Sequence, residues 1–85
     1  MSRTIHIQNI IRDAVEAVTG ITNYSNDASL IDRELAIIPA KFLYIFEIIE
    51  QRLHVPLSEI FIKHSFEVMT VENLTSAIME LESSH

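Results

Sequence analysis

Apolar residues recur at helical spacing near the start of the chain, at i, i+3, i+4, i+7, i+8 and i+11. They are Ile7, Ile10, Ile11, Ala14, Val15 and Val18. This single stripe predicts an amphipathic helix over about residues 5–19. Gly20 follows at the position where many helices end in a left-handed residue, and it supports that boundary.

The most apolar stretch of the chain begins near Pro39 and predicts a second helix that ends near Leu53. Proline is favoured at the first helical position because its missing N–H would have no partner inside the helix. One side of this helix gathers Ile38, Phe42, Ile45, Phe46, Ile49 and Leu53. Leu43 and Ile48 widen the apolar arc, so we expect this helix to be central and to pack against several neighbours. The preceding residues 21–38 are rich in Asn, Ser and Asp and predict a long loop.

The last third of the chain predicts a short helical piece and a closing helix. Ser58 can cap a short helix over residues 59–62, after a turn that contains a proline. Thr70 is a suitable N-cap for the closing helix, and Met69 before it can pack on Leu74. The stripe expected to be buried is Val71, Leu74, Ala77, Ile78 and Leu81.

No stretch alternates apolar and polar residues at the period of a strand. The predicted fold class is therefore all-α, a bundle of three main helices and one short helix with a long loop after the first helix. The chain has 85 residues, so we expect one domain over residues 1–85 with a core of about residues 5–82.

Composition and charge narrow the classes of function. Twelve acidic and six basic residues give a formal net charge of −6. With no Lys/Arg cluster, we expect neither nucleic acid nor a membrane surface as a partner. The absence of cysteine excludes disulfides, thiolate zinc sites and a cysteine nucleophile. No secretory signal or bilayer-spanning stretch is recognisable, so we expect a cytoplasmic protein.

Residues that could bind a metal or catalyse a reaction are scattered. The four histidines match no ligand spacing; they are His6, His54, His64 and His85. Residues 23–34 offer oxygens in the pattern of a calcium loop, but Ala28 replaces the glycine of its sharp turn, which favours an Asx-rich loop. A single glycine leaves no phosphate-binding loop or nucleophile elbow. We therefore expect no enzyme activity, no metal and no cofactor.

Three segments, taken in order, resemble an acyl carrier or peptidyl carrier protein over about residues 7–81. IIRDAVEAVTGI resembles the first helix of that family, RLHVPLSEIF the segment after its central helix, and TVENLTSAI its closing helix. The resemblance implies the same order of three main helices and one short one. In such carriers a serine within GxDSL, at the start of the central helix, carries 4′-phosphopantetheine, whose thiol holds the acyl or peptidyl cargo.

The resemblance fails at the attachment site. Without a gap, the family pattern LGxDSL falls on LAIIPA, residues 35–40, so Pro39 occupies the serine position and Ile38 the aspartate position. Pro39 has no hydroxyl to modify. Ser29 lies in a superficially similar DASL segment, but the chain meets Pro39 ten residues later, so Ser29 cannot head the central helix. We interpret Ser29 as part of the loop, with its modification as the alternative.

The surface that carrier partners recognise is also altered. Partners of the family usually dock on acidic residues along the central helix, and the corresponding stripe here is Ile37, Lys41, Tyr44 and Ile48. We take this stripe as the candidate partner surface, with Tyr44 as its anchor, because tyrosine is enriched at interface hot spots. The alternative is that Ile37 and Ile48 pack under the short helix while Lys41 and Tyr44 are solvated.

The resemblance without its attachment serine predicts a pseudo-carrier, a non-catalytic binding or scaffold module beside enzymes that modify peptides or acyl chains. Family analogy favours a peptide-maturation system, a protein partner, and a monomer or weak dimer. One alternative is a working carrier modified at an atypical serine. The other is a small lipid- or acyl-chain-binding bundle whose cavity would be lined by Phe42, Ile45, Phe46 and Ile49.

Overall fold

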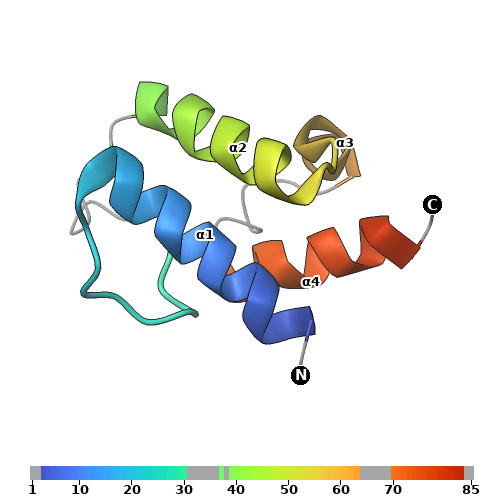
Figure 1. Ribbon diagram of the computed structural model, residues 1–85, viewed down its shortest axis with the longest axis horizontal. Coiled ribbons are helices and arrows are strands. Elements are labelled where there is room, and N and C mark those ends of the chain that lie inside the picture. The colour runs from blue at the N-terminus through green and yellow to red at the C-terminus, as the bar shows by residue number, and fades with distance from the viewer. Residues whose placement is uncertain (1–2, 31–36, 38, 64–69, 84–85) are drawn as a thin grey trace.

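A computed structural model describes residues 3–30, 37, 39–63 and 70–83 of the chain (Figure 1). These residues form four α-helices: α1 (Arg3–Thr19), α2 (Pro39–Leu53), α3 (Leu57–Lys63) and α4 (Val71–Ser83). No strand occurs in the described ranges, which confirms the predicted all-α class. None of the described helices is long and apolar enough to cross a membrane.

The helix at the centre of the molecule is α1. It packs against both α2 and α4, while α3 packs against α4. In Figure 1, α2 lies along one side of α1, and α4 lies beside the N-terminal half of α1. At 100° per residue, the buried residues of α1 spread over about 140°, from Ile10 to Val15, whereas those of α2 span about 80°. The wider face can contact two helices, and the narrower one faces mainly α1.

The prediction that residues 39–53 form the central helix is therefore wrong. Leu43, which was expected to extend the buried arc of that helix, is 71% exposed. Ile48 is partly buried and packs against the core. The sequence overestimated the buried arc because periodicity shows which residues are apolar and not how many neighbours a helix has.

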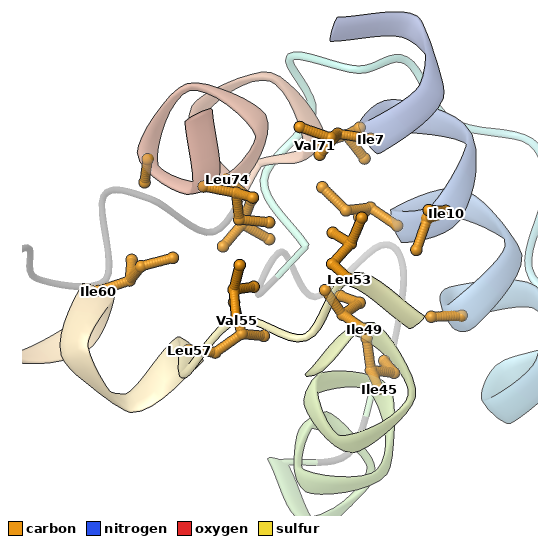
Figure 2. Close-up of a cluster of buried hydrophobic side chains, with 14 of the residues drawn as sticks. Ile7, Ile10, Ile45, Ile49, Leu53, Val55, Leu57, Ile60, Val71 and Leu74 are labelled. Atoms are coloured by element: carbon orange, nitrogen blue, oxygen red, sulfur yellow. The ribbon is translucent and has the colours of Figure 1, made fainter. Parts of the chain in front are cut away.

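The core collects side chains from all four helices. Figure 2 shows them directed into one cluster, with Val55 added from the turn between α2 and α3. Leu30, at the end of the described loop, is fully buried as well. The predicted stripe of α4 is buried throughout, and that of α1 is buried except at Val18, which is partly buried. Periodicity therefore identified the inner faces of α1 and α4.

Two helices end on a residue in the left-handed conformation. Gly20 has a φ of 76° and donates its N–H to the Glu16 carbonyl at 2.8 Å, as expected for a residue that closes α1. His54 ends α2 in the same way, with a φ of 57° and an N–H bonded to the Glu50 carbonyl at 2.8 Å. Histidine has a Cβ, so this conformation is strained at His54 and unstrained at Gly20.

The starts of the two last helices differ in how well they were predicted. The Thr70 hydroxyl accepts the Asn73 N–H at 2.9 Å, which confirms Thr70 as the N-cap of α4. Met69, its expected hydrophobic staple, lies outside the described residues. Ser58 lies inside α3 and not at its cap, because the helix already begins at Leu57, directly after a proline.

The two left-handed positions predict opposite responses to substitution. Gly20→Ala should lower the free energy of unfolding by about 1 kcal/mol, purely through backbone strain, since no described atom lies within 4 Å of the added Cβ. His54→Gly should raise it by about 0.5 kcal/mol, because the relieved strain exceeds the greater chain entropy of glycine. Urea unfolding followed by circular dichroism measures both. His54→Ala retains the Cβ and should have little effect; a loss with His54→Gly would contradict the strain at this residue.

Candidate functional site

The start of α2 is the position at which a carrier would hold its prosthetic group. α2 begins at Pro39, the position that the resemblance assigns to the modified serine. The next residue, Ala40, is exposed and has no reactive group. Ile38 and residues 35–36 of the aligned motif lie outside the described residues. The described residues of this helix start therefore offer no hydroxyl for attachment.

The four residues of the predicted partner surface differ in exposure. Tyr44 is 61% exposed, and Lys41 is half-buried. Ile37 and Ile48 are partly buried and pack against the core. The geometry thus brings Tyr44 to the surface and turns the two isoleucines inward.

Leu43 lies beside Tyr44 and is even more exposed, at 71%. We call these two side chains the α2 patch. The sequence prediction did not include Leu43 in the partner surface, although its angular position on the helix indicates exposure. Leu43 is about 120° away from the centre of the arc that α2 buries, so its position around the helix is enough to predict that it faces outward. Leu43 and Tyr44 are consecutive, so their side chains point about 100° apart on the outer side of α2, where they expose apolar atoms and one hydroxyl.

A second cluster of side chains forms around Arg12, on the side of α1 that faces the first loop. The guanidinium donates to the Asn26 side chain at 2.8 Å and to the carbonyls of Thr22 and Tyr24 at 3.1 and 3.0 Å. Its central carbon also lies 4.3 Å from the centre of the Tyr24 ring. Arginine suits this position because its planar group can donate several hydrogen bonds and stack on an aromatic ring at once.

The Arg12 cluster also reaches α4. The carbonyl of Asn26 accepts the backbone N–H of Glu72 at 2.9 Å, in the first turn of that helix. Arg12 therefore orders the first loop, and this loop in turn contacts the start of α4 through Asn26. Sequence reasoning missed this role, because the partners are 10 to 14 residues away from Arg12 and no periodic pattern joins them.

Tyr24 is the unusual member of this cluster. Its hydroxyl is buried and has no hydrogen-bond partner among the described residues. Burial raises the pKa of Tyr24, the positive charge of Arg12 lowers that pKa in part, and Glu16 raises it further. An unpaired buried hydroxyl is unfavourable, so Tyr24 contributes through its ring rather than through its oxygen.

In the described part of the loop, residues 21–30, several side-chain oxygens are already hydrogen-bonded within the protein. Ser25 donates to the Asp27 carboxylate at 2.6 Å, and the Asn26 side-chain oxygen is bonded to Arg12. Among the described residues, no group of three His, Asp or Glu side chains could hold a metal ion. Residues 31–34 of the calcium-like pattern lie outside the described ranges, and so do His64 and His85. Ser29, the alternative attachment residue, is half-buried.

The residues proposed to line an acyl-chain cavity lie on the inner side of α2. Ile45 and Ile49 are fully buried, and Phe42 is 8% exposed. Phe42 and Phe46 stack on each other, with ring centres 6.0 Å apart and planes at 30°. These contacts belong to the packing of α2 on the core.

Comparisons with known proteins do not identify the chain. No family model, no curated protein and no solved structure matches it. The resemblance to carrier proteins therefore remains a prediction from the sequence.

Arg12→Met should lower the free energy of unfolding by about 2 kcal/mol, because methionine keeps the apolar stem and leaves the loop without its charged donor. Urea unfolding measures the loss. Arg52→Met is the matched control: within the part of the chain that the structure describes, Arg52 forms one exposed pair, with Asp13 at 3.6 Å, so a loss of about 0.5 kcal/mol or less is expected. Equal losses for the two variants would contradict the anchoring role of Arg12.

Tyr24→Phe should raise the free energy of unfolding by about 1 kcal/mol at neutral pH, because it removes a buried hydroxyl without a partner. Since the folded-state pKa of Tyr24 is raised, the unfolded chain releases its proton first. Wild-type stability is therefore lost as pH rises from about 10 through the folded-state pKa.

The advantage of the Tyr24→Phe variant should consequently grow in alkaline solution. Urea unfolding between neutral and alkaline pH measures it. Tyr44→Phe, at a tyrosine that is 61% exposed, is the control. It should change the free energy of unfolding neither at neutral nor at alkaline pH. A Tyr24→Phe variant less stable than wild type would indicate that the hydroxyl is paired in solution.

Proposed function

We propose that the protein is a non-catalytic binding module related to acyl carrier proteins that works without 4′-phosphopantetheine. The observation that carries the proposal is the start of α2 at Pro39, where the resemblance would place the attachment serine. The order of the helices also supports it, because a long connection follows α1 and a short helix precedes α4. The three sequence segments that resemble carriers fall on α1, on the end of α2 with α3, and on α4.

The chemistry explains why one residue separates a carrier from a binding module. A transferase attaches the arm when the serine oxygen attacks the pantetheine-bearing phosphorus of coenzyme A. The pyrophosphate bond breaks, adenosine 3′,5′-bisphosphate leaves, and the serine proton is lost to a base or solvent, so the arm remains on serine as a phosphodiester. Proline has neither that oxygen nor a backbone N–H. Without the arm there is no thiol to hold a cargo, and the chain has no cysteine of its own. What remains is a folded bundle that can bind a partner.

The proposed partner is an enzyme that modifies peptides or acyl chains, and it would bind through the exposed side of α2. Tyr44 and Leu43 supply an apolar area there, with Lys41 beside it. Aromatic anchors of this kind often dominate the binding energy of an interface. Ile37 and Ile48, packed on the core, would support the surface from below rather than contact the partner.

Incubation with a promiscuous phosphopantetheinyl transferase and coenzyme A tests the proposal by intact mass. We expect the wild-type protein to remain unmodified. A variant with the family motif restored, Ala36→Gly, Ile38→Asp, Pro39→Ser and Ala40→Leu, should gain one arm. A matched variant with the same three other changes but Pro39→Ala should gain none.

The outcomes separate the parts of the proposal. An arm on the wild-type protein would contradict it and favour a working carrier, and Ser29→Ala would then show whether Ser29 bears the arm. A restored variant that folds and stays unmodified, even with acidic residues placed on the altered recognition stripe by Lys41→Glu and Tyr44→Glu, would contradict the relation to carriers.

A further inference from the structure

The first turn of α1 and the last turns of α4 are joined by side-chain contacts, and Figure 1 shows the two segments beside each other. The Thr4 hydroxyl donates a hydrogen bond to the Met79 sulfur, with 3.2 Å between Oγ1 and Sδ. Arg3 pairs with Glu82, one turn further along α4. Met79 is partly buried and packs against the core.

These contacts matter because the first turn of α1 is weakly supported. The carbonyls of this turn accept hydrogen bonds from the next turn, but the first N–H groups of a helix have no intrahelical partner. This turn has no acidic side chain to stabilise them, and Ile5 is 56% exposed. The Arg3–Glu82 pair is exposed and contributes little. Docking of this turn on α4 therefore depends on the environment of Met79.

We propose that Met79 is a reversible oxidation site and that its sulfoxide releases the first turn of α1 from α4. The oxidant is a peroxide. With hydrogen peroxide, a sulfur lone pair attacks one oxygen atom and the S–O bond forms as the O–O bond breaks. The other oxygen leaves as water with both hydrogens of the peroxide. The sulfur loses two electrons and the peroxide gains them. The product is polar where the thioether was apolar, so its burial against the core becomes unfavourable.

The contact with Thr4 also determines which sulfoxide forms. One sulfur lone pair accepts the Thr4 hydroxyl, and the 3.2 Å separation leaves no room for an oxygen atom between the two. The new oxygen is therefore added at the other lone pair, which gives one epimer. Each sulfoxide epimer is reduced by its own class of methionine sulfoxide reductase, so only one class should reverse the reaction.

Hydrogen–deuterium exchange on the full chain tests the proposal. The protein is treated with hydrogen peroxide, and the sulfoxide is located by peptide mapping. Exchange is measured at residues 7–10, whose N–H groups bond to the carbonyls of the first turn of α1. The control is Met79→Leu, a change that keeps the volume and leaves the other two methionines in place. We expect exchange to become about tenfold faster in the oxidised wild type, to stay unchanged in the control, and to recover with one reductase class.

Two results would overturn the proposal. One is equal exchange of residues 7–10 in the peroxide-treated wild type and the control. The other is a Met79 that resists peroxide until the protein unfolds. Thr4→Ala tests the stereochemistry: with the hydroxyl removed, both epimers should form and both reductase classes should be needed. Equal amounts of the two epimers in the wild type would show that Thr4 does not shield the sulfur.

Discussion

The wide apolar face of α1 is the constraint on which the rest of the structure depends. Its buried residues cover about 140° of the helix, enough to contact α2 along one side and α4 along the other. α3 joins this arrangement through α4. Most of the stability of such short helices comes from packing rather than from intrinsic propensity, so each outer helix depends on the face of α1 that it covers.

The same helix organises the polar part of the molecule. Arg12 lies beside the apolar face and donates to three acceptors in the first loop, and Tyr24 stacks on its guanidinium. Leu30 fixes the end of the described loop by burial, and Asn26 connects it to the first turn of α4. A loop rich in Asn, Ser and Asp is thereby held by one charged donor and one apolar anchor.

The position of α2 at the edge of the bundle has a consequence for function. Because α2 packs mainly against α1, its opposite side stays open and carries Leu43 and Tyr44. In the proposed function, this side binds a partner, and the start of the helix at Pro39 removes the tether that a carrier would need. The two features act together, since a module that cannot hold a cargo covalently depends on its surface for any role.

The sequence by itself determined the all-α class, the end of α1 at residue 19, both ends of α2, and the start of α4 after Thr70. The signals are local: helical periodicity, Gly20, Pro39 and the Thr70 cap act within about four residues along the chain. Only the tertiary structure decided that α1 is central and that Arg12 orders the first loop. It also decided the pairing of Thr4 with Met79, 75 residues apart. Such contacts depend on which faces meet after the chain has folded, and no spacing of residues along one helix specifies the neighbour on its other side.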